Sequence, residues 1–177
     1  KMRKAGWPMN LPKDDHPGMD LPDPLTKDAM CDLLERLNEQ ARKETKKKKA
    51  RNGIKDILHA KYALQIATGY MDIVRKLPSV VHVNTQQSGK ITVVGDLHGQ
   101  LRDLIHIFRH NGMPSFDNPY LFNGDLVDRG DYSVEIVLLL FGFAVADPGS
   151  IYINRGNHED MTVCTGYGFV DELVNKF

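Results

Sequence analysis

Three short polar segments, each coming directly after a short apolar run, constrain most strongly what this chain can fold into. The segments are 95–99 (GDLHG), 124–130 (GDLVDRG) and 156–159 (GNHE), spaced roughly 30 residues apart. A short apolar run is typical of a buried strand, and open α/β sheets place active sites in the loops at the carboxyl ends of their strands. The runs that precede the three segments are 91–94 (ITVV), 120–122 (YLF) and 151–153 (IYI).

Strands and helix-like patterns alternate along the second half of the chain. Such alternation is typical of βαβ units around a parallel sheet, so we expect an α/β fold. An additional edge strand is expected at 79–83, and a hairpin turn at 86–89 should lead into the next strand. The expected helices span about 100–111 (with Leu101, Leu104, Ile105 and Phe108 facing inward), 133–145 and 168–177.

Two helices are expected before the sheet, in a helical extension over 26–78. Thr26 suits a helix N-cap, and behind it apolar residues recur on one helical face. A second helix is expected from about Ile54 to Leu77, where Pro78 would end it. The expected inward residues are Met30, Leu33, Leu34, Leu37 and Ala41 of the first helix, and Ile57, Leu58, Leu64, Ala67, Met71 and Val74 of the second.

The first 25 residues carry five of the nine prolines, which disfavours regular hydrogen-bonded structure. We expect an extended arm here, pinned by Trp7, Met9 and Leu11. The alternative is a loose terminus, since chain ends are often poorly ordered.

A basic run at 42–51 holds the one block of like charge in a chain whose net charge is zero. It suits a calmodulin-type or other acidic partner, or a nuclear address. The alternative is a solvated helix end, where the helix dipole favours positive charge. The run has no interleaved aromatic residues, so we expect no nucleic-acid binding.

Composition and cysteine content limit the cellular compartments in which the chain is expected to work. No apolar run is long enough to span a membrane, and the start resembles no signal peptide. Cys31 and Cys164 lie far apart and favour free thiols in a reducing compartment, so we expect a cytoplasmic protein, with nuclear or ciliary placement as alternatives. The chain begins with Lys and stops after Phe177, and we expect it to be a fragment of a longer protein.

The polar residues of the three loops favour a metal site. Asp96 and His98 alternate beyond a strand end, so their side chains can converge on one cation. Asp125 can bridge two cations through its two oxygens, and Asn157 offers an amide oxygen to the second. Two metals would clamp a phosphate and lower the pKa of a bridging water.

The remaining loop residues suit phosphate transfer to water. Arg129 has a planar fork of donors that matches a phosphate. His158 can donate a proton to the leaving alkoxide, and Asp128 can orient that imidazole. Glu159 is expected to be structural. Any one of these residues alone is a weak signal, and the specificity lies in their joint occurrence in three successive loops.

The segments GDLHGQ, GDLVDRG and RGNHE resemble, in order and spacing, the signature of the phosphoprotein phosphatase family of serine/threonine phosphatases. Within that family the sequence is most similar to the EF-hand phosphatases of the retinal-degeneration type. The resemblance covers roughly residues 22–177. It rests further on 24–26, 58–62, 108–114, 118–120, 122–125, 154–160 and 167–169.

The resemblance implies an α/β, calcineurin-like metallophosphoesterase sandwich, preceded by an α-helical extension. The residues at 79–177 would form its N-terminal half. It also implies a dinuclear centre of iron, zinc or manganese that acts on phosphoproteins. The implied ligands are Asp96, His98 and Asp125 for one metal and Asp125 and Asn157 for the other, with His158 as general acid, Asp128 as its partner and Arg129 on the phosphate.

The chain departs from the family pattern at its end. Two further histidine ligands and a second phosphate-binding arginine are implied, and neither they nor an EF-hand loop occur in these residues. The sequence therefore leaves two functions open: part of a metal-dependent phosphoserine/phosphothreonine phosphatase, or a non-catalytic phosphatase-like module in a larger assembly. A diesterase or nucleotidase is disfavoured by the complete GDLVDRG segment.

Overall fold

A computed structural model describes residues 18–47 and 53–177 of the chain. Trp7, Met9 and Leu11 of the expected arm, and residues 48–51 of the basic run, lie outside these ranges. The elements in chain order are α1 (Lys27–Lys47), η2 (Gly53–Asp56), α2 (Ala60–Val74), β1 (Thr92–Val94), α3 (Leu101–Asn111), β2 (Tyr120–Phe122), α4 (Ser133–Ala146), β3 (Ile151–Ile153), α5 (Met161–Tyr167) and α6 (Phe169–Lys176).

The three short strands form one parallel sheet in the order β1-β2-β3. Strands buried on both faces read as continuous apolar runs, and Tyr120 and Phe122 of the central strand are fully buried. The parallel arrangement expected from the sequence is confirmed. Because neighbouring strands run the same way, their carboxyl ends lie at one edge of the sheet, and the loops after β1, β2 and β3 meet there.

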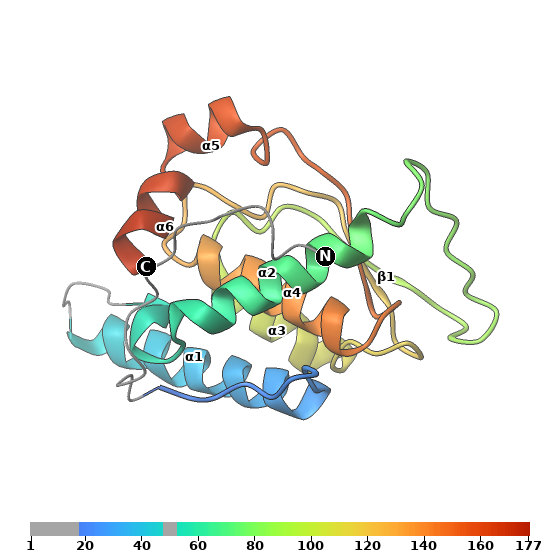
Figure 1. Cartoon of the computed structure of the whole chain (residues 1–177), viewed down its shortest axis with the longest axis horizontal. Helices are drawn as coiled ribbons and strands as arrows, with labels where there is room; N and C mark the ends of the chain where they lie inside the picture. The colour runs from blue at the N-terminus through green and yellow to red at the C-terminus, as the bar shows by residue number, and fades with distance from the viewer. Residues whose placement is uncertain (1–17, 48–52) are drawn as a thin grey trace, which may run out of the picture.

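Helix α4 is the centre of the core. It is apolar on every side, as is typical of a helix buried all round, and ten of its residues are buried. Figure 1 shows α4 running behind α2, and α4 also contacts α1, β3 and α6. The sulfur end of Met30 on α1 lies where a side chain at Gly142 of α4 would stand, so the two helices pack closely.

The expected first helix and its inward face are confirmed. The side-chain oxygen of Thr26 accepts a hydrogen bond from the Ala29 amide at 3.3 Å, as an N-cap does. Both carboxylate oxygens of Glu35 accept from Arg109 of α3 at 3.0 Å, which ties α1 to the helix after β1. The five predicted inward residues, Met30, Leu33, Leu34, Leu37 and Ala41, are all buried.

The prediction for the second helix was wrong in its start and end; of its expected inward residues Leu58 is buried, whereas Met71 and Val74 are exposed. Helix α2 begins only at Ala60, where the His59 ring accepts from the Lys61 amide at 3.0 Å, and it ends at Val74. Ile66 is its buried residue, whereas Met71 is 37% exposed. The reason is that α2 lies against α4 through a different stripe, on which Tyr70 stacks on Phe141.

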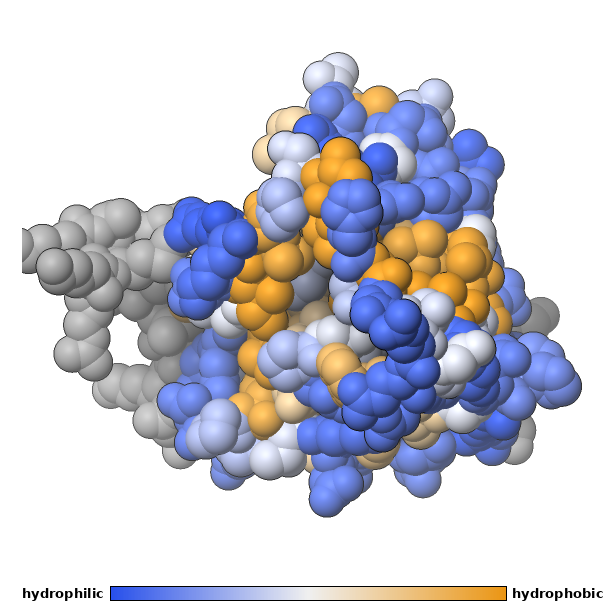
Figure 2. All heavy atoms as spheres, turned by 90° about the vertical axis from the view of Figure 1, so that its right-hand side faces the viewer, coloured by the Kyte–Doolittle hydropathy of each residue, from blue (hydrophilic) through white to orange (hydrophobic). Residues whose placement is uncertain are grey.

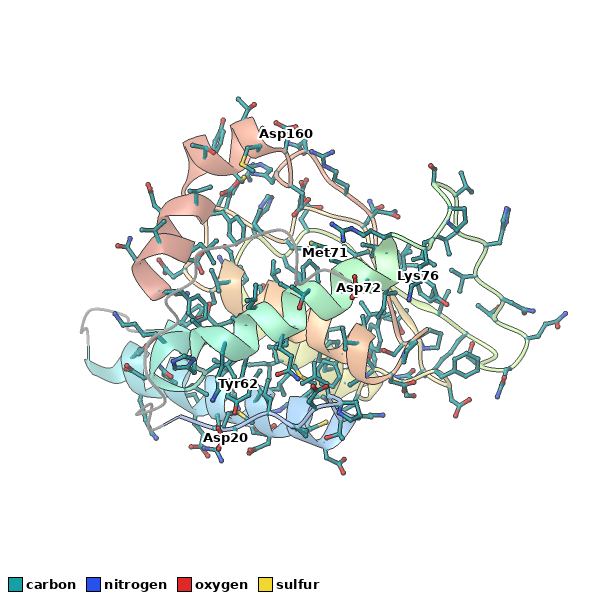
Figure 3. The ribbon with its side chains drawn as sticks, viewed as in Figure 1. Asp20, Tyr62, Met71, Asp72, Lys76 and Asp160 are labelled. Atoms are coloured by element: carbon teal, nitrogen blue, oxygen red, sulfur yellow. The ribbon has the colours of Figure 1, made fainter. Side chains whose placement is uncertain are left out.

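The described part of the arm forms a strap over the helices. The Met19 amide donates to the Ile57 carbonyl at 2.8 Å, and Tyr62 of α2 donates to the Asp20 carboxylate at 2.5 Å. Figure 3 shows Tyr62 and Asp20 beside one another, where the strap passes α2. The arm is therefore held over the helices from Met19 onward.

The expected edge strand at 79–83 is absent from the described residues. The segment is irregular and Val80 is 69% exposed, and within the described residues nothing pairs with the outer edge of β1. A turn is nevertheless present, closed by the Gly89 amide on the Thr85 carbonyl at 2.7 Å. Figure 1 shows the connection from α2 to β1 reaching away from the body of the protein.

Apolar residues gather on the face that carries this connection (Figure 2). A hollow of about 490 Å³ lies between the end of α2, residues 77–83 and β3, and its lining includes Val74, Leu77 and Tyr152. Among the described residues, no helix combines the length and the apolar character that a membrane crossing requires.

The expected last helix at 168–177 is preceded by a second short helix, α5. Gly168 separates α5 from α6 with a left-handed φ of 113°, a conformation that glycine adopts without steric cost. The carboxylate of Asp160 caps α5 by accepting from the Thr162 amide at 2.9 Å, and this bond lowers the pKa of that carboxyl. Figure 3 shows Asp160 at the start of α5.

Candidate metal and phosphate site

The three signature loops are joined by backbone hydrogen bonds before any side chain is considered. The Leu97 and His98 amides donate to the Asp125 carbonyl at 3.0 Å, and the Gly99 amide donates to the Leu126 carbonyl at 2.9 Å. A Cβ atom at Gly124 would lie 2.3 Å from the amide nitrogen of Gly156, so these loops touch backbone to backbone. The sheet therefore delivers three loops to one small region.

Backbone strain is concentrated in these loops. In the described part of the chain, four non-glycine residues have positive φ: His98 (42°), Asp125 (52°), Asp128 (68°) and Arg129 (66°). Such conformations cost of order 1–3 kcal/mol each and persist where the surrounding structure enforces them, which is typical of functional sites. All four residues were singled out from the sequence.

Three of the predicted metal ligands come together. Asp96, His98 and Asp125 offer ligand atoms that lie within 4.8 Å of one another. The Nδ1 of His98 donates to the Val127 carbonyl at 2.8 Å, which leaves Nε2 as the free ligand atom, 3.8 Å from an Asp96 oxygen. Carboxylate oxygens with one imidazole suit manganese, iron or zinc, so this donor set fits the expected first metal.

The fourth predicted ligand lies against the third. With its nitrogen turned toward Asp125, the Asn157 amide donates to the two carboxylate oxygens at 3.1 and 3.3 Å. In the opposite orientation the amide oxygen faces that carboxylate, an arrangement that a shared cation would stabilise. Asp125 and Asn157 therefore fit part of a second metal site.

A buried acid–imidazole pair lies beside these residues. The Nδ1 of His158 donates to Asp128 at 2.8 Å, and the two residues are only 4% and 1% exposed. This carboxylate contact assigns the proton of the neutral ring to Nδ1. Arg129 donates to the Nε2 of His158 at 3.3 Å, and the ring of His98 lies 4.6 Å from that of His158. The structure thus brings the candidate acid, its partner and the candidate phosphate ligand together.

Glu159 fixes two of the loops to each other. One carboxylate oxygen accepts from the Asp125 and Gly156 amides, both at 2.9 Å, and the other accepts from the Leu126 amide at 2.8 Å. These contacts are all to backbone groups, as expected of a structural role.

Two features near the site were not found by sequence reasoning. The Tyr167 ring packs edge-on against His158 at 5.3 Å, and it remains 63% exposed. Lys176 and Glu135 form a buried ion pair at 2.6 Å, at the base of the loop that carries Arg129. Burial raises the pKa of the Glu135 carboxyl, and the Lys176 ammonium opposes that rise. A pair separated by 41 residues leaves no local pattern in the sequence.

The described part of the basic run is ordinary surface. Arg42 and Lys43 are exposed, and Lys43 lies 3.8 Å from Glu39 one turn earlier on α1. Lys48 to Arg51 lie outside the described residues, so partner binding at 42–51 stays a prediction.

Comparison with known proteins places the chain among phosphatases. The family described as Calcineurin-like phosphoesterase matches residues 89–177. Serine/threonine-protein phosphatase 5 of Arabidopsis thaliana is 51% identical over 119 residues, which are 67% of this chain and 22% of that protein. Serine/threonine-protein phosphatase with EF-hands 2 of Homo sapiens is 49% identical over 124 residues, which are 70% of this chain and 16% of that protein.

A solved structure gives the same answer for the fold. The protein serine/threonine phosphatase from Saccharomyces cerevisiae with similarity to human phosphatase PP5 aligns with a TM-score of 0.65 and 39% identity, over 68% of this chain and 39% of that one. The expected partial calcineurin-like fold is thus confirmed. The resemblance to EF-hand phosphatases is also confirmed. Serine/threonine-protein phosphatase 5 matches with a similar identity over a similar length. The chain spans about a fifth of the length of the Arabidopsis and human relatives. The chain belongs to the calcineurin-like phosphoesterase family, and its matched relatives there are serine/threonine-protein phosphatases.

Proposed function

We propose that the whole protein hydrolyses phosphoserine and phosphothreonine in other proteins, in a metal-dependent reaction. The observation that carries the proposal is the joint geometry of the site. A buried Asp128–His158 pair and Arg129 lie beside the ligand atoms of Asp96, His98 and Asp125. Four of these residues, His98, Asp125, Asp128 and Arg129, have a strained backbone with positive φ. The matched relatives are serine/threonine-protein phosphatases, which supports the same activity.

Each residue has a defined part in the proposed reaction. Two metal ions held by Asp96, His98, Asp125 and Asn157 would supply an activated water and neutralise phosphate charge. We propose manganese, or iron with zinc, from the mixed oxygen and imidazole donors.

The other three residues, Arg129, His158 and Asp128, bind the phosphate and supply the proton for the leaving group. Arg129 donates to the phosphate oxygens, and His158 donates the proton that the leaving serine or threonine alkoxide needs. Asp128 accepts from Nδ1, so the proton on Nε2 of the protonated ring is the one that is given up. The Arg129 guanidinium lies 3.3 Å from Nε2, so a phosphate bound by Arg129 would lie beside the acid.

The family resemblance implies ligands beyond those described. We propose that two further histidines and a second arginine are supplied by parts of the whole protein outside these 177 residues, since the relatives are several times longer. The non-catalytic module finds no support, because the matched relatives are named phosphatases and a scaffold has no need of a buried acid–imidazole pair. We further propose a cytoplasmic protein and an acidic partner for 42–51, both from the sequence.

His158→Ala tests the proposal most directly. In the whole protein, turnover of a phosphothreonine peptide should fall by about two orders of magnitude, the usual contribution of a general acid. Metal content should stay unchanged, because His158 is not a proposed ligand. His110→Ala, a surface histidine on α3, serves as the matched control. Unchanged turnover in His158→Ala would remove the residue from this role, and an inactive wild-type protein supplied with manganese, iron and zinc would refute the function itself.

A further inference from the structure

A buried lysine lies under the loop that carries Asp128 and Arg129. Lys176, near the end of α6, is 5% exposed, and its ammonium has three hydrogen-bond donors. All three are used: they reach Glu135 at 2.6 Å, Glu172 at 2.7 Å and the backbone carbonyl of Asp131 at 2.7 Å. The third contact is the informative one, since it joins α6 to the loop of the candidate site.

The two carboxylates that face Lys176 are themselves fixed. Glu135 is fully buried at the first turn of α4, and its other oxygen accepts from the Ile54 amide of η2 at 3.0 Å. The oxygen of Glu172 that meets Lys176 also accepts from the Val134 amide at 2.9 Å. The ammonium is therefore held from two sides, and its remaining hydrogen is directed at Asp131.

The loop needs such support. Asp128 and Arg129 are consecutive non-glycine residues with φ of 68° and 66°, a strained conformation that persists only where the surrounding structure enforces it. A cleft of about 390 Å³ lies between this loop and α6, so side-chain packing does not fill that space. Helix α6 instead reaches the loop by hydrogen bonds, from the Phe169 amide to the Asp128 carboxylate at 3.0 Å and from Lys176 to Asp131.

We propose that Lys176 is a positioning residue for phosphate hydrolysis. Its bond to the Asp131 carbonyl holds the strained loop in the conformation that presents Arg129 to the phosphate and Asp128 to His158. The proposal rests on the function proposed above. It adds that α6, through a side chain far from the reacting atoms, sets the geometry of the phosphate ligand.

The test must separate positioning from stability, because a buried carboxylate left without its lysine destabilises the fold. Lys176→Met removes the charge, and Lys176→Met/Glu135→Gln also neutralises the carboxylate while keeping an oxygen for the Ile54 amide. The double variant should recover part of the lost stability, since Glu172 keeps its charge, but it should still lack a donor to Asp131. Met30→Ala is the matched control, since it makes a cavity between α1 and α4 without touching the loop.

Three readouts in the whole protein decide the matter. In the double variant, amide hydrogen exchange at Gly130 and Tyr132 should become at least about tenfold faster, because the loop loses an anchor. Its kcat/KM on a phosphothreonine peptide should fall about 10- to 100-fold, as a misplacement of about 1 Å does. The inhibition constant of inorganic phosphate should rise about tenfold through Arg129, with metal content unchanged. Met30→Ala should keep kcat/KM within about twofold of wild type.

Each other outcome overturns one claim. A stable double variant with wild-type exchange, phosphate inhibition and activity refutes the positioning role. An equal loss of activity in Met30→Ala refutes it too, since general destabilisation would then explain the effect. If the wild-type protein hydrolyses no phosphopeptide, the proposed function fails, while the exchange rates still report whether Lys176 holds the loop.

Discussion

Glu159→Gln tests whether one carboxylate holds two site loops together. Glutamine keeps the shape of the side chain, but one of its two terminal atoms becomes an NH₂ group that cannot accept. In the better orientation its oxygen keeps the Asp125 and Gly156 amides, and its NH₂ faces the Leu126 amide, 2.8 Å from the original oxygen. The substitution therefore removes at least one hydrogen bond and weakens two others by removing the charge.

The expected cost follows from these contacts. A hydrogen bond to a charged group contributes about 1.5–3 kcal/mol, and a donor left without an acceptor adds a desolvation penalty unless water reaches it. Glu159 is half-buried, so some solvent compensation is expected. We therefore expect Glu159→Gln to lower the free energy of unfolding by about 2–3 kcal/mol. Metal affinity should fall at least about tenfold, because the Asp125 and Leu126 amides orient Asp125, the proposed bridging ligand.

Denaturant unfolding and a manganese titration measure both effects. Glu39→Gln is the matched control, because that carboxylate on α1 is 69% exposed and belongs to a surface ion pair at 3.8 Å. It should change stability by less than about 0.5 kcal/mol. A Glu159→Gln protein as stable as the control, with wild-type manganese affinity, would show that the loops are held by other contacts.

Three further changes follow from the same structure. Gly124→Ala should destabilise the protein by several kcal/mol and abolish metal binding, since φ is 88° and the new Cβ would lie 2.3 Å from the next loop's backbone; the melting temperature and metal content report this. Asp125→Asn should lose both metals, and a metal analysis that still finds two per chain would contradict the bridging role. Burial raises the pKa of Glu135, so its neutral form stabilises the fold at low pH and this stability is lost as pH rises through the folded pKa. Lys176→Met should raise that pKa further, so its cost in unfolding free energy should be smaller at about pH 5 than at about pH 7.5, and an equal cost at both would refute the linkage.

The site residues were predictable because their chemistry limits the choice of residue. Asp96, His98 and Asp125 follow strands whose apolar character is visible in the sequence, and parallel strands bring such loops together. The inward face of α1 was predictable for a similar reason, since its apolar residues keep helical spacing along the helix. The catalytic and ligand roles themselves remain predictions.

The errors arose where tertiary contacts decide the local structure. Val80 and its neighbours have strand-like composition, but composition alone does not make a strand, and this segment does not pair with β1. The sequence placed Ile57 in α2. In the structure its amide instead donates to the Ile54 carbonyl of η2, and its carbonyl accepts from the Met19 amide of the strap. Lys176 and Glu135 meet across 41 residues, and each alone is an ordinary charged residue in a helical pattern.

The backbone contact between the first two site loops has a genetic consequence. A Cβ at Gly99 would lie 2.7 Å from the Gly130 carbonyl carbon, and a Cβ at Gly130 would lie 2.3 Å from the His98 carbonyl oxygen. Damage at a packed pair of large side chains can be suppressed by shrinking the partner residue. In this pair both partners are already the smallest residue, so no second-site substitution at the other glycine can make room. A suppressor screen begun from either glycine should therefore yield true revertants at these two positions and no compensating exchange.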